Sequence, residues 1–212
     1  MKIIDISWPI SVETTGYKDR KVVAFEEIKS FDVDTVRESA ILLNSHTGTH
    51  IDAPSHFIRD GKTIDQVALS QLVGPCKVVD LTHVAEEITA EVLQAKESEM
   101  SFSAGDIILL KTTNSAILPT DPFSPRFVYL HHSGAEYLLQ KKVQAVGIDY
   151  LGIERSQPHH PTHIDLMKNN VVIIEGLRLQ SVKQGSYFVC CLPLAIQALE
   201  AAPARAILIE GI

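Results

Sequence analysis

Residues 44–57 constrain the fold more than any other part of this chain. They read NSHTGTHIDAPSHF and place His46, His50 and His56, together with the carboxylate Asp52, within eleven residues. In an extended backbone, side chains two positions apart point to the same side, so His50 and Asp52 share one face. Imidazole nitrogens and carboxylate oxygens are the usual protein ligands of zinc and related ions such as manganese. The stretch therefore predicts a metal site, and a polar surface loop is the alternative.

Two backbone features help to gather these groups. Gly48 lies between His46 and His50 and lets the chain turn. Pro54 ends any regular strand pairing and redirects the chain before His56. A carboxylate among imidazoles can bridge two metal ions, because each of its oxygens can face one cation. The stretch is thus compatible with a binuclear centre.

A second polar cluster lies nearer the C-terminus. It contains His159, His160 and His163, and Glu175 follows His163 by twelve positions at the end of the apolar run 171–174. A carboxylate at the end of an apolar strand is costly to bury unless it is paired or binds a metal. By chemistry alone, the three histidines are rival ligands.

The string HTGTHIDAPSHF closely resembles the signature of the bacterial kynurenine formamidase family, also called the cyclase family. Members of this family are metal-dependent amide hydrolases, and isatin hydrolase is a relative. The resemblance implies that His46, His50 and Asp52 hold one metal ion and that Asp52 also reaches a second. It implies that His56 is the proton donor and acceptor.

The resemblance extends to the second cluster. The family pattern has a histidine and a glutamate at this same separation, followed by Gly-Leu as in this chain. The resemblance therefore implies that His163 binds the second metal and that Glu175 bridges both metals. This spacing favours His163 over its two neighbouring histidines.

One expected substrate contact departs from the family pattern. Family members have an aromatic residue near the N-terminus that touches the substrate, and Tyr17 is its nearest match here. The usual Pro-Gly-Asp after this aromatic is replaced by Lys18, Asp19 and Arg20. Tyr17 is therefore either a substrate contact or a half-exposed loop tyrosine.

The implied reaction is hydrolysis of an aryl formamide such as N-formyl-kynurenine to kynurenine and formate, through a metal-bound hydroxide. The cofactors are two divalent metal ions per subunit, with zinc expected and manganese as the alternative. His56 would pass a proton to the leaving nitrogen. The alternatives are the same site acting on a cyclic amide or lactone, and a metal-binding protein without turnover. The resemblance also implies a homo-oligomer, either a dimer or a tetramer.

Composition and charge exclude several other classes. The chain has 212 residues, 45% of them hydrophobic, and a formal net charge of −7, which argues against nucleic-acid and anionic-membrane partners. Asp5 interrupts the first apolar run too early for a signal peptide, and no run approaches the length of a membrane span. Cys76, Cys190 and Cys191 form no pairing framework, and the last two should face opposite sides of a strand. We expect a cytoplasmic protein with one domain over residues 1–212.

The pattern predicts a mixed α/β fold with a central, partly barrel-like sheet and outer helices, similar to the swivelling β/β/α fold of the family. Expected strands are residues 2–7, 21–33, 38–44, 77–82, 106–112, 143–150, 170–175, 187–192 and 204–210, and expected helices are residues 63–72, 90–95, 133–142 and 193–202, with a long loop at 113–128. Ser133 and Glu136 predict a capping box for the third helix.

Polar groups outside the two clusters are expected to be structural. Asn114 reads as a turn residue after a strand, and His131 and His132 as residues beside a helix start. Asp149 ends a strand, where it can accept hydrogen bonds from backbone donors of the following turn.

Overall fold

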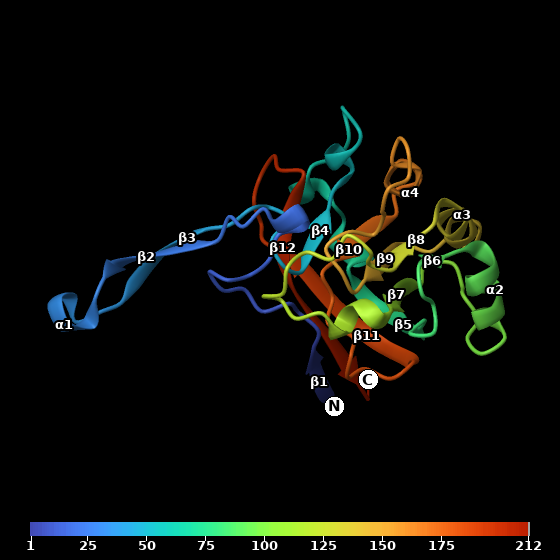
Figure 1. The fold of residues 1–212 in the computed structure, drawn as a ribbon, viewed down its shortest axis with the longest axis horizontal. Coiled ribbons are helices and arrows are strands. Elements are labelled where there is room, and N and C mark those ends of the chain that lie inside the picture. Colours follow the sequence, from blue (N-terminus) through green and yellow to red (C-terminus); the bar gives the residue numbers. More distant parts are fainter. Residues whose placement is uncertain (212) are drawn as a thin grey trace.

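A sheet that closes on itself organises the protein, described here over residues 1–211 by a computed structural model (Figure 1). The strand order is β1-β12-β11-β5-β7-β9-β10-β4, and β4 also pairs with β12, which closes a ring. The strands are β1 Lys2–Asp5, β4 His50–Asp52, β5 Val73–Asp80, β7 Ile107–Lys111, β9 Ala145–Ile148, β10 Val172–Glu175, β11 Gly185–Pro193 and β12 Ala201–Glu210. Strands β5, β7, β9 and β10 pair in parallel, whereas β1, β4, β11 and β12 pair antiparallel. The expected mixed, barrel-like α/β fold is confirmed.

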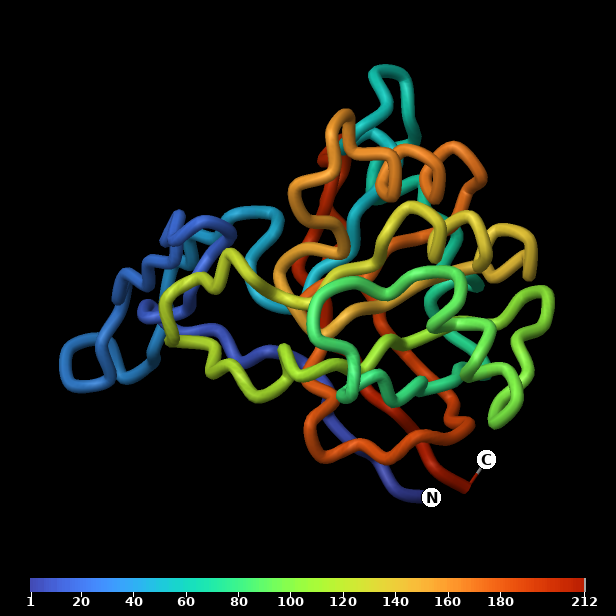
Figure 2. The backbone as a smooth tube through the Cα atoms, turned by 45° about the vertical axis from the view of Figure 1, so that its right-hand side comes forward, coloured from blue at the N-terminus to red at the C-terminus, as the bar shows by residue number. Residues whose placement is uncertain are grey.

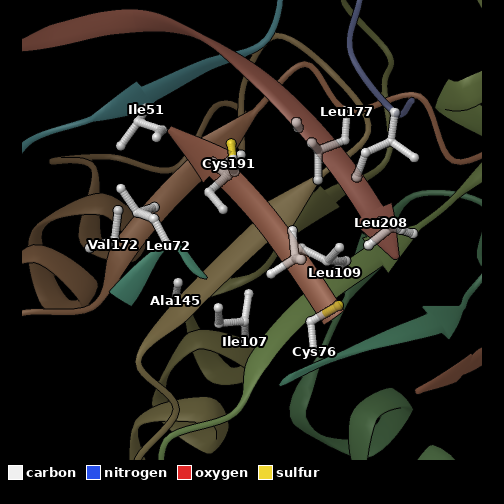
Figure 3. Close-up of a cluster of buried hydrophobic side chains, with 14 of the residues drawn as sticks. Ile51, Leu72, Cys76, Ile107, Leu109, Ala145, Val172, Leu177, Cys191 and Leu208 are labelled. Carbon is white, nitrogen blue, oxygen red and sulfur yellow. The ribbon is translucent and has the colours of Figure 1, made fainter. Parts of the chain in front are cut away.

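Strand β7 shows how the sequence builds two cores. Ile107 and Leu109 point into the barrel, whereas Ile108 and Leu110 point to its outer side, and all four are fully buried. A strand covered on both faces must be continuously apolar, as the run 107–110 is. Figure 3 shows the inner cluster, in which Ile107 and Leu109 lie close to Cys76.

Helices cover the outer side of the ring. The helices are α2 Ala90–Glu97, α3 His132–Gln140 and α4 Pro161–Lys168, and a small parallel sheet of β6 Glu87–Ile88 and β8 Tyr129–Leu130 lies among them. The outer cluster joins Leu93 of α2, Leu138 of α3 and Leu166 of α4 to the sheet. Burial of each such leucine contributes about 1.5–3 kcal/mol. No helix in residues 1–211 is long and apolar enough to cross a membrane.

The cysteines are part of this packing. Cys191 lies in the barrel core and its neighbour Cys190 is half-exposed, so the expectation of opposite faces is confirmed. Burial raises the pKa of Cys76 and of Cys191 to about 12, which keeps both thiols protonated.

A hairpin projects from the body of the molecule (Figures 1 and 2). It consists of β2 Ala24–Lys29, the short helix α1 Phe31–Asp34 and β3 Glu38–Leu42, which we call the arm. The two expected strands are present, although residues 31–33 are the start of α1 and not the end of a strand. Every residue of the two strands is exposed.

Two expected helices are wrong because long-range packing overrides local propensity. Residues 63–72 form two 3₁₀ turns, Ile64–Gln66 and Leu69–Gln71, separated by an extended segment that buries Val67 in the barrel core. Residues 193–202 form no helix, since β11 continues to Pro193 and Ala201 and Ala202 pair with β4 to close the ring.

The start of α3 also differs from expectation. The helix begins at His132, and the ring of His131 accepts a hydrogen bond from the backbone N–H of Ser133. The expected capping box of Ser133 and Glu136 is therefore wrong, because His131, two residues before Ser133, is the N-cap and accepts the free N–H of Ser133. The helix α4, which carries His163, was not expected.

Candidate metal centre

The predicted ligands meet on the outer side of the sheet, where β4 and β10 lie side by side. In the antiparallel register, His50 is opposite Glu175, and Asp52 is opposite Ile173. Ile51, between His50 and Asp52 on β4, points into the barrel core, so His50 and Asp52 point the other way. The alternation read from the sequence therefore places these two side chains on one face.

Histidines His46 and His50 surround one oxygen of Asp52. Oδ1 of Asp52 lies 3.0 Å from Nδ1 of His46 and 3.5 Å from Nε2 of His50. The same Nε2 of His50 lies 3.3 Å from Oε2 of Glu175.

His163 approaches the other oxygen of each carboxylate. Its Nε2 lies 3.5 Å from Oε1 of Glu175 and 4.0 Å from Oδ2 of Asp52. Each carboxylate thus presents one oxygen toward His50 and the other toward His163. This is the arrangement by which two carboxylates can bridge a pair of cations.

The donor set fits divalent metal ions on the evidence of its unsatisfied atoms. Nε2 of His50 and Oδ1 of Asp52 are buried and have no hydrogen-bond partner among the described residues. Buried polar atoms without partners are rare in folded proteins. His50, Asp52 and Glu175 are also close enough to share one ion. Two imidazoles and two carboxylates of this kind suit zinc and manganese alike.

Both histidine rings are oriented by acceptors on their far side. Nδ1 of His50 lies 2.9 Å from the carbonyl oxygen of Gly48, and Nδ1 of His163 lies 2.7 Å from Oε2 of Glu154. A proton on Nδ1 leaves Nε2 free to face the carboxylates, which is the usual second-sphere arrangement at metal sites.

Glu154 is the residue that sequence reasoning missed. It is buried, and its Oε2 accepts hydrogen bonds from both the ring and the backbone N–H of His163. The only signal in the sequence is a carboxylate directly after the mostly apolar segment 150–153. A carboxylate at this position is costly to bury, but the sequence does not show which residue it contacts.

The electrostatics follow from these contacts. Burial lowers the pKa of His50, but its 3.3 Å contact with Glu175 and the charges of Asp52 and Glu175 outweigh burial and raise that pKa to about 9. Burial also lowers the pKa of His163, but its contacts with Glu154 and Glu175 outweigh burial and raise that pKa to about 9. Burial raises the pKa of Glu175, but its contacts with His50 and His163 lower that pKa well below its usual range. With these raised pKa values, a cation that binds His50 or His163 has to displace a proton from the ring.

His56 lies beside this centre. Its ring centre is 4.3 Å from that of His46 and 6.3 Å from that of His163. Burial lowers the pKa of His56, so its ring is neutral at pH 7. His56 is also close enough to His46 and Asp52 to share an ion with them. The geometry therefore suits a proton carrier and also permits a ligand.

These groups line a cavity of about 360 Å³. Tyr17, Phe57 and Leu151 contribute apolar surface to its walls, and Lys18, Arg20 and His160 also line it. Tyr17 is 38% exposed, and its ring packs edge-on against Phe123 with the centres 4.9 Å apart. The predicted substrate contact is thus brought to the same cavity as the ligands.

The polar residues that the sequence marks as structural, Asn114, His131, His132 and Asp149, lie outside the cavity. Asp149 is fully buried and accepts hydrogen bonds from the backbone and hydroxyl groups of Thr112 and Ser115, as expected for a structural carboxylate. Asn114 bridges its loop to Val128 through two hydrogen bonds, and His132 contacts Asp165 at 2.7 Å.

Several known proteins are similar to this chain in sequence or in fold. Residues 4–155 match the family model described as putative cyclase. The chain is 31% identical to the kynurenine formamidase of Salinibacter ruber over 98% of this chain and 97% of that protein. It is 42% identical to a structure described as a predicted metal-dependent hydrolase from Bacillus stearothermophilus, with a TM-score of 0.85 and coverage of 98% and 97%. Isatin hydrolase A from Ralstonia solanacearum shares the fold, with a TM-score of 0.88, 23% identity and coverage of 99% and 92%.

Proposed function

This chain belongs to the cyclase family, and from that premise we propose that it hydrolyses an aryl formamide such as N-formyl-kynurenine to kynurenine and formate. The observation that carries the proposal is the placement of Asp52 and Glu175 between His50 and His163 at an apolar-walled cavity. The name of the Salinibacter ruber relative supports this substrate over other amides.

The residues divide into two sets of candidate ligands. We assign His46, His50 and Asp52 to one divalent ion, and His163 to the second, with Asp52 and Glu175 reaching both. Two such ions supply Lewis-acid activation of water and of the amide carbonyl when they are bound. We propose zinc, and manganese is the alternative that the same donor set allows.

The chain's own groups then move the proton and hold the substrate. His56 is neutral at pH 7 because burial lowers its pKa, so it can accept a proton and return it to the leaving nitrogen. The apolar surfaces of Tyr17 and Phe57 offer a place for the aromatic ring of the substrate and keep bulk water from it.

The test combines metal content with activity. We would measure the metal content of the purified protein and then formate release from N-formyl-kynurenine before and after chelation. The proposal requires about two metal ions per chain and formate release that stops on chelation and returns with added metal. Metal uptake without formate release would overturn the proposed substrate and direct the search to cyclic amides and lactones.

We also propose that the protein is a homo-oligomer held together by the arm. Phe25 and Ile41 pair across its two strands and are 48% and 65% exposed, and Ile28 on the other face is 49% exposed. An isolated two-stranded hairpin is at best marginally stable in water, so an arm that is apolar on both faces needs covering. A second copy of the chain can supply that cover.

The oligomer is tested by sedimentation of wild type and of Ile41→Glu. The variant should dissociate into monomers at concentrations at which the wild type remains associated. Leu69→Glu is the control, because Leu69 is a comparably exposed leucine outside the arm. A monomeric wild-type protein, or an associated Ile41→Glu variant, would refute this role of the arm.

A further inference from the structure

Two cations at the cavity that holds the candidate ligands have no role in the chemistry described above. Lys18 and Arg20 both line this cavity. Neighbouring Lys21 pairs with Glu13, but within residues 1–211 neither Lys18 nor Arg20 forms an ion pair. Two cations without ion-pair partners thus lie beside one cavity of a chain whose net charge is −7.

The segment that carries these cations is held in a fixed shape. Residues 17–19 form a 3₁₀ turn, in which the N–H of Asp19 donates to the carbonyl of Gly16 at 3.0 Å. A Cβ atom on Gly16 would clash with the carbonyl of Arg20, so the segment closes tightly on itself. Lys18 and Asp19 both have left-handed backbone angles, with φ of 55° and 58°. Such strained conformations cluster at functional sites.

Contacts to the long loop 113–128 fix this turn from the other side. Oδ1 of Asp19 accepts a hydrogen bond from the N–H of Phe123 at 2.8 Å, and the ring of Tyr17 packs on that of Phe123. Nζ of Lys18 lies 5.3 Å from the centre of the Tyr17 ring, which keeps the ammonium beside the cavity wall. The alternating residues Tyr17 and Asp19 thus anchor the turn, and Lys18 and Arg20 remain available.

The cavity therefore combines three kinds of surface: candidate metal ligands, apolar walls at Tyr17 and Phe57, and the cations Lys18 and Arg20. We propose that Lys18 and Arg20 form an anion subsite that selects substrates whose aromatic body carries a carboxylate remote from the scissile amide. Hydrogen bonds between charged partners are among the strongest that a protein side chain makes, and the guanidinium of Arg20 can bind a carboxylate through two N–H groups. The inference rests on the proposed function, since it names the substrate class of the same site.

The test uses two amides that differ in one group. Both are formanilides with an ortho-acyl side chain, which ends in a carboxylate in one and in a primary alcohol in the other. For the metal-loaded wild type we expect kcat/KM for the acid to exceed that for the alcohol by about tenfold or more. In Lys18→Met and Arg20→Met, KM for the acid should rise by about tenfold, and the preference for the acid over the alcohol in kcat/KM should fall toward one.

Lys21→Met is the matched control, because Lys21 lies in the same segment but does not line the cavity. It should behave as the wild type. Equal kcat/KM for acid and alcohol in the wild type, or equal losses on both substrates in the Lys18 and Arg20 variants, would overturn the anion subsite.

Binding of the two deformylated amines, measured by calorimetry, separates this inference from the proposed reaction. If neither formanilide is hydrolysed, but the carboxylate amine binds more tightly than the alcohol amine and loses that advantage in Arg20→Met, then the reaction is wrong and the subsite is right. Equal binding of the two amines would refute the subsite, whether or not formate is released.

Discussion

Glu154 accepts a hydrogen bond from Nδ1 of His163 at 2.7 Å and a second from the backbone N–H of the same residue at 3.0 Å. One buried carboxylate oxygen thus fixes both the position and the ring orientation of His163, and Nε2 faces Asp52 and Glu175. Glu154 contacts the candidate ligand and not the bridging carboxylates, so its role is to position His163.

Replacing this carboxylate should weaken metal binding. In Glu154→Gln, the neutral amide is a weaker acceptor for the imidazole N–H, and we expect metal affinity to fall by about 10- to 100-fold. Competition with a chelator measures this affinity directly. Glu87→Gln is the control, since the Glu87 carboxylate accepts a hydrogen bond from Tyr129 outside the cavity. Unchanged affinity in Glu154→Gln would show that packing alone orients His163.

The proposed proton carrier makes a separate prediction. His56→Ala should retain the full complement of metal, and kcat for formate release should fall by about 10²- to 10⁴-fold, because general acid–base catalysis is lost. Elemental analysis and kinetics on the same preparation measure both. Loss of a metal ion in His56→Ala would instead make His56 a ligand, as its proximity to His46 and Asp52 permits. His132→Ala serves as the control, since His132 lies outside the cavity.

Metal uptake should release protons. The pKa of both His50 and His163 is raised to about 9 in the metal-free protein, since contacts to carboxylates outweigh burial. At pH 7.5 both rings therefore carry a proton that a metal ion must displace, and binding should release about two protons. The release should decline as the pH passes 9, and metal affinity should rise with pH up to that value. Calorimetry in buffers of different ionisation enthalpy measures the proton count, and no release at pH 7.5 would contradict these pKa values.

The sequence predicts local patterns well and long-range pairing poorly. Alternation at His50, Ile51 and Asp52 correctly separates a core residue from two site residues, because a strand's period is set by its own backbone. The expected helix at residues 193–202 fails, because Ala201 and Ala202 gain partners in β4, some 150 positions earlier. No local pattern shows which strand will close the ring.

The same limit applies to the candidate site. The resemblance places His163 and Glu175 from their spacing, and the structure brings Glu175 to both His50 and His163, while the roles of His163 and Glu175 as ligands stay a prediction. Glu154 belongs to none of the sequence motifs. Its importance depends on the position of α4, which brings His163 into contact with it. Residues 24–29 and 38–42 read correctly as strands, yet their exposure follows from the arm's projection away from the sheet.

Gly176 should be essential for the close contact between the segment that carries Glu175 and the segment that carries His50. It follows Glu175 directly, has φ of +70°, and lies so close to Gly48 that a Cβ atom would clash with the Gly48 carbonyl. Its own carbonyl accepts a hydrogen bond from the hydroxyl of Thr49 at 2.5 Å. Gly176→Ala should lower the free energy of unfolding by about 2–5 kcal/mol, from backbone strain and from the clash together.

Gly105→Ala separates these two contributions. Gly105 also has a positive φ, of +83°, but no atom lies within 4 Å of the Cβ position there. Gly105→Ala should lower the free energy of unfolding by only about 1–2 kcal/mol, from backbone strain alone. Denaturant unfolding of both variants measures the difference, and chelator competition should show weaker metal binding in Gly176→Ala alone, since Gly48 must move and His50 moves with it. Equal destabilisation and equal metal affinity in the two variants would mean that the contact between Gly176 and Gly48 does not hold the centre together.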